Sequence, residues 1–230
     1  MDNLIVSEKF YSIQGEGKTT GIPAVFVRLA GCNILCKGKD WICDSIEVWQ
    51  KGVKTPFNEV LEVLWVQKLR AGAHLVFTGG EPMLHQKKII KYLKWFKIKF
   101  DFYPIVEIET NGTIIPSNEI GHYVDFWNVS PKLSNSGETK LRRYKKETLI
   151  TYSNYKEVMF KFVISNETDL QEINTDFDFV SNRNIYLMPA GDSQEKLNKI
   201  RLKVINFCLV NNYRYSDRLH IVAWNQKTGV

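Results

Sequence analysis

The stretch Gly31-Cys32-Asn33-Ile34-Leu35-Cys36-Lys37-Gly38-Lys39-Asp40-Trp41-Ile42-Cys43-Asp44-Ser45 directly follows an apolar, β-branched run that is typical of a strand. It holds three of the four cysteines of the chain, Cys32, Cys36 and Cys43. Three thiolates, unlike four, can hold an iron–sulfur cluster and leave one iron open to a further ligand. The stretch therefore predicts an open metal site at the point where a strand ends.

Zinc is the competing metal, because structural zinc sites take four Cys or His ligands at short spacings. The histidines His74 and His85 stand far along the chain from the three cysteines. Cys208 lies within a helical pattern, where a cysteine is usually a small buried apolar residue. Without a clear fourth ligand, the pattern favours the iron–sulfur cluster.

Length and composition indicate one globular domain that covers residues 1–230. The hydrophobic content is 44% and the charged content 24%, as in soluble proteins. We expect no signal peptide and no membrane span, because no apolar run approaches the required ~20 residues. Cysteines gathered in one loop make a poor disulfide framework, which favours a reducing cytoplasm.

The formal net charge of +6 permits an acidic partner but does not require one. Many lysines fall between residues 87 and 99, where apolar residues interleave with them at helical spacing. This arrangement favours the solvated face of an amphipathic helix over a nucleic-acid surface. The basic segment Arg142–Lys146 follows a turn signal and fits either a solvated loop or a contact site.

Strand and helix patterns alternate along the chain. The strand-like runs are Pro23–Ala30, His74–Phe77, Ile105–Glu109, Val124–Val129, Val158–Ile164, Ile185–Pro189 and Leu219–Trp224. Helical patterns include one predicted from Asn58 to Arg70 and one from Gln194 to Val210. Such alternation indicates an α/β fold with a largely parallel sheet, in which ligands gather at the carboxyl ends of the strands.

Several motifs stand at those strand ends, in a fixed order. They are Phe10-Tyr11-Ser12-Ile13-Gln14-Gly15-Glu16-Gly17, Arg28-Leu29-Ala30-Gly31-Cys32-Asn33, Cys43-Asp44-Ser45, Thr78-Gly79-Gly80-Glu81-Pro82, Glu109-Thr110-Asn111-Gly112, Ser130-Pro131-Lys132 and His220. With these motifs the chain resembles, nearly end to end, the radical S-adenosylmethionine enzymes of the 7-carboxy-7-deazaguanine synthase family.

The resemblance implies a single-domain incomplete (β/α)6-type TIM-like barrel with modified, reduced helices. It implies three cofactors, namely a [4Fe-4S] cluster, S-adenosylmethionine and Mg²⁺. It further implies a homodimer that takes electrons from a flavodoxin- or ferredoxin-type reductant. The reaction would be that of a lyase in queuosine and 7-deazaguanine biosynthesis, which converts 6-carboxy-5,6,7,8-tetrahydropterin to 7-carboxy-7-deazaguanine and releases ammonia.

One departure from the family pattern lies between the second and third cysteines. Radical enzymes usually carry C-x3-C-x2-C, whereas six residues, Lys37 to Ile42, separate Cys36 from Cys43 here. Members of this synthase family vary the loop. We therefore expect the additional residues to bulge outward while Trp41 and Ile42 stay packed.

The resemblance also assigns site residues. The cluster ligands would be Cys32, Cys36 and Cys43, and Ser45, where the family usually has threonine, would give Mg²⁺ a hard oxygen ligand. Residues expected at S-adenosylmethionine are Ile42, Cys43, Asp44, Gly79, Gly80, Glu81, Ser130, Pro131, Lys132, Met188, Pro189, Ala190 and Gly191. Residues expected at the substrate are Ile13, Gln14, Gly15, Arg28, Thr78, Glu109, His220 and Val230.

Four of these residues have specific expected roles. Arg28 suits the substrate carboxylate, because a guanidinium makes two parallel charge-assisted hydrogen bonds. The glycines Gly79 and Gly80 would allow close backbone approach to the cofactor, since neither carries a side chain. Glu81 would accept a hydrogen bond from the ammonium group of the cofactor.

Two other functions stay open at this point. A radical activating enzyme that acts on a partner protein would share the cluster and cofactor residues, but would not require Gln14 and Arg28. A non-catalytic metal-binding or nucleic-acid-binding module would explain the cysteines and the basic charge. It would leave the motif from Gly79 to Pro82 unexplained.

Overall fold

The computed structural model describes residues 2–38, 42–43, 45–227 and 229. The predicted site residues Asp44 and Val230 therefore lie outside the described residues, as does Trp41 in the cysteine loop.

The described residues form one sheet of nine strands. In spatial order these are β3 (Val53–Pro56), β1 (Asn3–Ile13), β2 (Pro23–Leu29), β4 (His74–Gly79), β5 (Ile105–Thr110), β6 (Phe126–Val129), β7 (Val158–Ile164), β8 (Ile185–Pro189) and β9 (Arg214–Tyr215). All neighbours from β2 to β9 pair in parallel, and only β1 pairs antiparallel, with β2 and with β3. The predicted α/β fold with a largely parallel sheet is confirmed.

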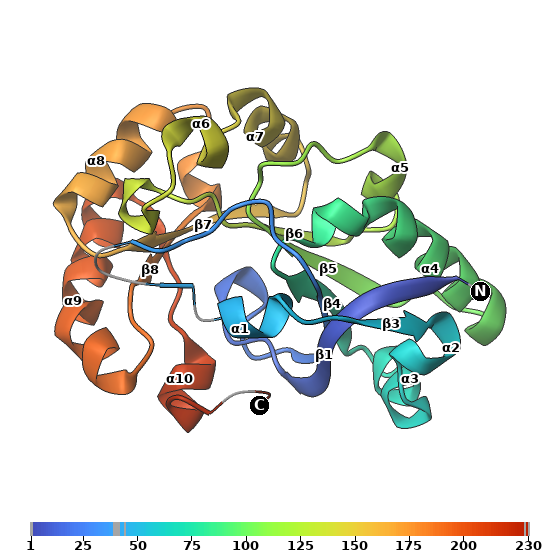
Figure 1. Ribbon diagram of the computed structural model, residues 1–230. Helices are drawn as coiled ribbons and strands as arrows, with labels where there is room; N and C mark the ends of the chain where they lie inside the picture. The colour runs from blue at the N-terminus through green and yellow to red at the C-terminus, as the bar shows by residue number, and fades with distance from the viewer. Residues whose placement is uncertain (1, 39–41, 44, 228, 230) are drawn as a thin grey trace.

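The sheet is open across the described residues, since its edges, β3 and β9, do not pair with each other. Helices cover its outer side, and Figure 1 shows α4, α7, α8 and α9 around the rim from right to left. The helices are α1 (Ile46–Trp49), α2 (Phe57–Val60), α3 (Val63–Arg70), α4 (Gln86–Phe100), α5 (Asn118–Gly121), α6 (Lys140–Arg143), α7 (Lys146–Ser153), α8 (Glu167–Asp176), α9 (Gln194–Asn211) and α10 (Leu219–Trp224), with 3-10 turns η1 (Gly17–Thr19), η2 (Pro82–His85), η3 (Ser134–Ser136) and η4 (Asn182–Asn184).

The two faces of the sheet differ in chemistry. Alternate residues of a strand point to opposite faces, so Phe77, Ile108 and Phe160 turn outward. There they join the main hydrophobic core, together with Tyr92 and Phe96 of α4. The inner face carries a small apolar cluster of Ala24, Phe26 and Val76, and otherwise mostly polar side chains. A polar inner face prepares the sheet to bind a polar ligand.

Two elements differ from the prediction. The helix expected from Asn58 to Arg70 is broken into α2 and α3, because Leu61 is extended, with φ −121° and ψ 142°. Val63 consequently turns to solvent, with 78% of its surface exposed. The segment Leu219–Trp224, which was expected to be a strand, is the helix α10. Its sequence lacks the strict alternation of apolar and polar residues that fixes a strand in a sheet.

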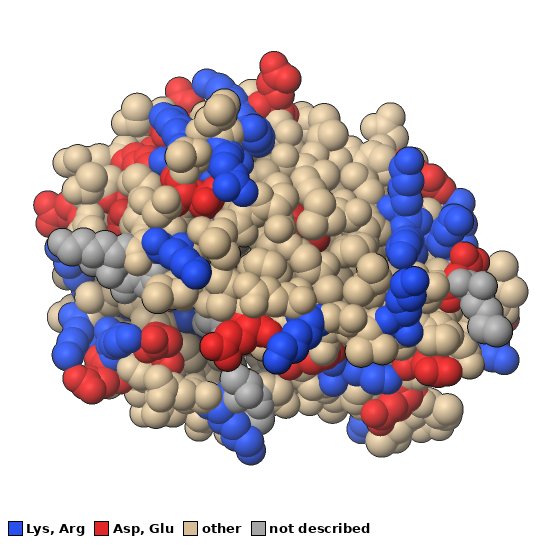
Figure 2. All heavy atoms as spheres, viewed as in Figure 1, with Lys and Arg blue, Asp and Glu red and all other residues tan. Residues whose placement is uncertain are grey.

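The lysine-rich segment forms the predicted amphipathic helix α4, which buries Ile89, Ile90 and Leu93. On its exposed side Lys94 pairs with Glu119 and Lys97 with Asp101. Figure 2 shows Lys and Arg interspersed with Asp and Glu over the helices, while the centre of this face is largely uncharged. Among the described residues no helix is both long and apolar enough to cross a membrane.

Candidate active site

The loop after β2 brings the cysteines together. The amide of Cys43 donates to the carbonyl of Cys36 at 3.0 Å, and Lys37 pairs with Ile42 in an isolated antiparallel bridge. These two contacts bring the ends of the segment between the second and third cysteines together, while residues 39–41, on which the expected outward bulge falls, lie outside the described residues. The expectation that Ile42 stays packed is wrong, since 62% of its surface is exposed.

The chemistry of the thiols fits a cluster. Cys36 is 5% exposed, and burial raises the pKa of its thiol to about 11. Burial also raises the pKa of Cys32, while the nearby charge of Lys132 acts in the opposite direction. Metal ligation replaces such thiol protons. No three described His, Cys, Asp or Glu side chains lie close enough to share one metal ion. Thiols that bind separate irons of one cluster need not do so.

The glycine-rich loop after β4 lies directly against the cysteine loop. A Cβ atom on Gly79 would lie 2.1 Å from the carbonyl oxygen of Leu29, and one on Gly80 would lie 2.7 Å from Cβ of Cys32. The amide of Glu81 donates to the carbonyl of Gly31 at 2.9 Å. Within the chain, Gly79 thus allows close backbone approach to the end of β2, and Gly80 allows it to the cysteine loop.

Glu81 is fully buried and holds two loops in place. Its carboxylate accepts from the amide of Met83, the hydroxyl of Thr110 and the amide of Asn111, at 2.7–3.0 Å. Burial raises the pKa of this carboxyl, while the three hydrogen bonds and the charge of Lys132 oppose that effect. The predicted contact of Glu81 with an ammonium group stays a prediction, and its present partners make it an anchor of the site.

Asn111 joins the loop after β5 to the cysteine loop; the sequence motif contains this residue, but no role was predicted for it. Its Nδ2 donates to Oδ1 of Asn33 at 3.0 Å and lies 4.0 Å from Sγ of Cys32. Its side-chain oxygen accepts from the amide and the hydroxyl of Thr113. The signal that pointed to it was its place after Glu109-Thr110, at a strand end.

Strands β6 and β8 bring further predicted cofactor residues to the same edge. Ser130 accepts from Nζ of Lys132 at 3.0 Å, and the Lys132 charge acts on Cys32, Cys36 and Glu81. Pro131 is buried next to them. The predicted residues after β8 also fall at this edge, as Met188, Pro189, Ala190 and Gly191 end the strand and begin its loop.

The inner face holds a buried polar network around Gln14. Nε2 of Gln14 donates to Glu107 at 2.9 Å and to Glu109 at 3.1 Å, and Thr78 donates to Glu109 at 2.7 Å. Gln14 is only 2% exposed. The amide nitrogen of Gln14 thus donates to two carboxylates. Its role in the structure is to orient Glu109, rather than to donate to the substrate itself.

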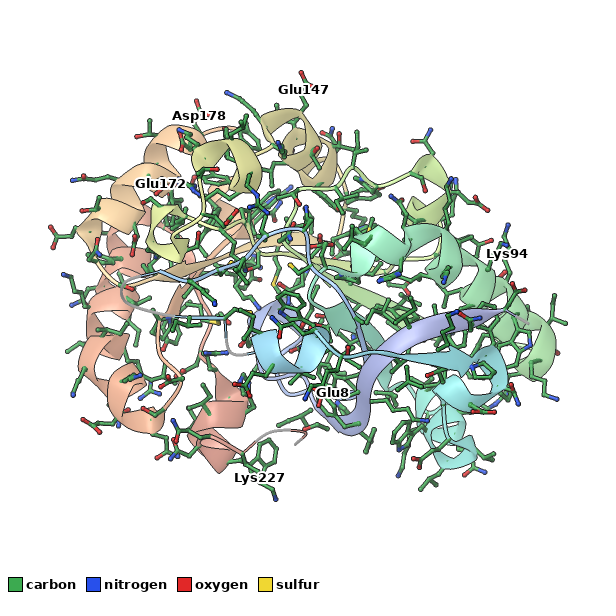
Figure 3. All side chains as sticks on the ribbon, viewed as in Figure 1. Glu8, Lys94, Glu147, Glu172, Asp178 and Lys227 are labelled. Atoms are coloured by element: carbon green, nitrogen blue, oxygen red, sulfur yellow. The ribbon has the colours of Figure 1, made fainter. Side chains whose placement is uncertain are left out.

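Arg28 lies on the same inner face, since β2 and β4 place Arg28 beside Thr78. Its Nε donates to Oε1 of Glu8 at 2.7 Å. Glu8 lies near the centre of this view, below α1, whereas Lys94, Glu147 and Asp178 project from the rim (Figure 3). The guanidinium thus makes one charge-assisted hydrogen bond to a carboxylate, rather than the two parallel bonds expected with the substrate.

The remaining predicted substrate residues meet at the end of β1. Ile13 is the last residue of β1, and a Cβ atom on Gly15 would lie 2.4 Å from Nδ1 of His220. Leu219 donates its amide to the carbonyl of Gly15 at 2.8 Å, which places α10 next to this loop. The structure thus brings together residues from both ends of the chain.

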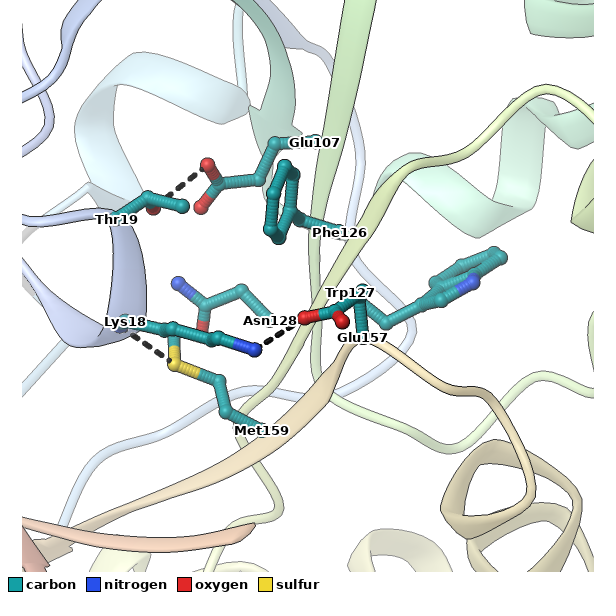
Figure 4. Close-up of a pocket in the computed structure, with 8 residues that line it drawn as sticks. All are labelled: Lys18, Thr19, Glu107, Phe126, Trp127, Asn128, Glu157 and Met159. Atoms are coloured by element: carbon teal, nitrogen blue, oxygen red, sulfur yellow. Dashed lines mark hydrogen bonds and ion pairs between the residues drawn. The ribbon is translucent and has the colours of Figure 1, made fainter.

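A small cavity of about 10 Å³ lies between η1 and strands β5, β6 and β7, near Thr19, Glu107 and Met159 (Figure 4). Thr19 donates to Glu107 at 2.8 Å. Asn128, which is 1% exposed, has no hydrogen-bond partner for its side-chain amide among the described residues. The unpaired amide of Asn128 at this cavity was not expected from the sequence.

The predicted magnesium ligand is less defined. Oγ of Ser45 lies 3.6 Å from Sγ of Cys43, at the start of α1, and so next to the cysteine loop. A single hydroxyl does not make a magnesium site by itself, because the ion also requires carboxylate, substrate or water oxygens.

Known proteins share both the sequence pattern and this fold. The family model described as "4Fe-4S single cluster domain" matches residues 13–159. A 7-carboxy-7-deazaguanine synthase from Pyrobaculum aerophilum is 35% identical over 97% of this chain and 96% of its own. The synthase of Halobacterium salinarum is 32% identical over 96% of this chain and 91% of its own.

A solved structure supports the fold independently. The crystal structure of QueE from Escherichia coli matches with a TM-score of 0.69 over 95% of each chain, at 24% sequence identity. At that identity the likeness concerns the fold. With relatives above 30% identity along nearly the whole length, the chain belongs to the 7-carboxy-7-deazaguanine synthase family.

Proposed function

We propose that this protein is a radical S-adenosylmethionine lyase that converts 6-carboxy-5,6,7,8-tetrahydropterin to 7-carboxy-7-deazaguanine and releases ammonia. The observation that carries the proposal is the direct packing of the glycine-rich loop on the cysteine loop, with Gly80 against Cys32. This packing places the predicted cluster ligands beside the polar inner face that holds Arg28 and Glu109.

The cofactors would be held at the carboxyl edge of the sheet. Cys32, Cys36 and Cys43 would hold the [4Fe-4S] cluster, and the loops that begin at Gly79, Ser130 and Met188 would surround S-adenosylmethionine. When bound, this pair supplies one-electron chemistry that abstracts a hydrogen atom from the substrate. The fit is supported by the buried thiol of Cys36 and by backbones that come close only because glycine has no side chain.

Protein groups would bind and orient the substrate. Arg28 would exchange Glu8 for the substrate carboxylate, since both present the same planar acceptor. Glu109, fixed by Gln14 and Thr78, would accept from the N–H groups of the pterin edge. His220 and the backbone of Gly15 would close the far side. Fixed polar groups of this kind position the reacting carbon near the radical source and exclude water.

Finer features belong to the same proposal. We expect the sheet to be an incomplete (β/α)6-type barrel whose opening admits the substrate, and the protein to be a cytoplasmic homodimer. Ser45, with Asp44 beside it in sequence, would contribute to a Mg²⁺ site with substrate oxygens. A flavodoxin- or ferredoxin-type protein would supply the electron.

Anaerobic reconstitution with iron and sulfide, followed by incubation with a reductant, S-adenosylmethionine and the carboxypterin, tests the function. Formation of the deazapurine with one ammonia per turnover supports it. A protein that cleaves S-adenosylmethionine yet leaves the carboxypterin untouched would instead be an activating enzyme. A protein that binds only zinc would be neither.

Replacing Arg28 by alanine should weaken substrate binding and spare cofactor cleavage. A charge-assisted hydrogen bond is worth enough that we expect KM for the carboxypterin to rise by about 10- to 100-fold. Reductive cleavage of S-adenosylmethionine without substrate should stay at the wild-type rate. An unchanged KM would remove Arg28 from the substrate site.

Replacing Ser45 by alanine should reduce the response of turnover to Mg²⁺. Loss of the hydroxyl should lower kcat/KM by about tenfold at limiting Mg²⁺. Threonine at this position keeps the oxygen and fixes its rotamer, so Ser45→Thr should restore or strengthen the response. Turnover titrated with Mg²⁺ after chelation measures this, and a wild type that ignores chelator and Mg²⁺ would contradict it.

A further inference from the structure

Lys161 is a buried, charged side chain to which the proposed function gives no role. It stands in the middle of β7 and is 5% exposed. It lies two residues after Met159, which is in register with Asn128, so its side chain points to the inner face of the sheet. A lysine is almost never buried without a partner, so its surroundings should show what it serves.

The partner of Lys161 is Glu16, in the loop that follows β1. The two side chains form an ion pair, and Nε of Arg218 also donates to the Glu16 carboxylate at 3.0 Å. Although burial acts to raise the pKa of Glu16, the charges of Lys161 and Arg218 outweigh it and hold the pKa far below its ordinary value. Likewise the charges of Glu16 and Glu109 raise the pKa of Lys161 against the effect of burial. Both groups are therefore charged at neutral pH.

This ion pair lies beneath a junction between the two ends of the chain. Next to Glu16, the carbonyl of Gly15 accepts from the amide of Leu219 at 2.8 Å. On its other side the amide of Gly17 donates to Oγ of Ser216 at 2.7 Å. Gly17 has φ +75°, a backbone conformation that favours glycine, and a Cβ atom at this position would clash with the side chain of Met159.

We propose that Lys161 is a positioning residue for substrate binding. Through Glu16 it holds the loop from Gln14 to Gly17 against α10, and so fixes Gly15, His220 and the Gln14 amide that orients Glu109. Lys161 does not touch the substrate. The inference rests on the proposed function, because it assigns that loop to the carboxypterin.

Kinetics of Lys161→Met test the proposal, since methionine keeps the length and apolar stem but removes the charge. Misplacement of the loop should raise KM for the carboxypterin by about 10- to 100-fold. We expect kcat to change by less than about threefold, because the reacting groups are not removed. The iron content and the substrate-independent cleavage of S-adenosylmethionine should match wild type.

Lys18→Met is the matched control. Lys18, in the turn η1 that directly follows the loop, also pairs with a glutamate, Glu157, but both side chains are more than a third exposed. An exposed pair contributes little, so this variant should keep the wild-type KM. If Lys161→Met does not fold, the double variant E16Q/K161M replaces it, since that variant leaves no Glu16 carboxylate buried without its lysine. An unchanged KM in whichever variant folds overturns the proposal.

Hydrogen exchange separates this proposal from the proposed function. In the Lys161 variant, peptides that cover residues 13–19 and 216–222 should exchange faster than in wild type, while β4 and β5 stay protected. This readout requires no turnover. If wild type forms no deazapurine but the exchange result holds, the proposed function is wrong, and only the role of Lys161 in holding the loop stands. If exchange in both peptides is unchanged, Lys161 does not position the loop.

Discussion

Replacing Cys36 by alanine should abolish the iron–sulfur cluster and, with it, all turnover. The remaining thiols, Cys32 and Cys43, cannot hold a cluster that needs three protein ligands. Iron bound after reconstitution should fall from about four atoms per chain to background. Because the difficult step belongs to the bound cofactors, no protein residue can replace them. Iron and sulfide analysis and the visible absorption band measure the loss of the cluster, and deazapurine formation measures the loss of turnover.

Cys208→Ala is the matched control for that experiment. Cys208 is also a buried cysteine, but it lies in α9, where its Sγ contacts the carbonyl of Arg214 at 3.3 Å. Its loss should cost about 1 kcal/mol of unfolding free energy and leave the iron content unchanged. If the Cys208 variant lost iron, or the Cys36 variant kept four irons, the assignment of the cluster ligands would be wrong.

Replacing Glu81 by alanine should cause the largest loss of stability of any single change at the site. It leaves the donors of Met83, Thr110 and Asn111 without an acceptor where solvent does not reach. Each unpaired buried donor costs about 1–3 kcal/mol, so we expect a loss of about 3 kcal/mol or more. For a chain of this size that corresponds to a fall in Tm of roughly 10 °C. Thermal unfolding measures it.

Function should fall in the same variant, because Glu81 joins the loops that follow β4 and β5 near the cysteines. We expect weaker cluster retention as well as lower Tm. Glu147→Ala is the control, since Glu147 is exposed on α7 (Figure 3) and such a change usually costs less than about 0.5 kcal/mol. Equal stability of the two variants would show that Glu81 does not anchor these loops.

Local sequence was sufficient where one periodicity governed a whole segment. The strand runs at His74, Ile105, Val158 and Ile185 became β4, β5, β7 and β8, and the lysine-rich helix became α4. It was insufficient where a local pattern was ambiguous. The segment from Leu219 to Trp224 is apolar enough for a strand, yet it is a helix that packs on the loop after β1.

The site divides in the same way. Motifs at strand ends identified the glycine-rich loop, the cysteines and Arg28, because each motif is continuous in the sequence. The pairing of Glu16 with Lys161 joins residues 145 positions apart, and no local pattern contains it. The same holds for Asn111 beside Cys32, which are 79 positions apart.

The sequence by itself determined which chemistry this protein can carry, since the three thiols of Cys32, Cys36 and Cys43 and the paired glycines are required residue types at required spacings. Only the tertiary structure decided how that chemistry is held. It gave Gln14 and Glu81 the role of anchors, because their polar groups are buried and must be paired where they lie. It also placed Lys161 beside Glu16, where Arg218 from the other end of the chain pairs with the same carboxylate, since a buried charge is stable only beside its partner.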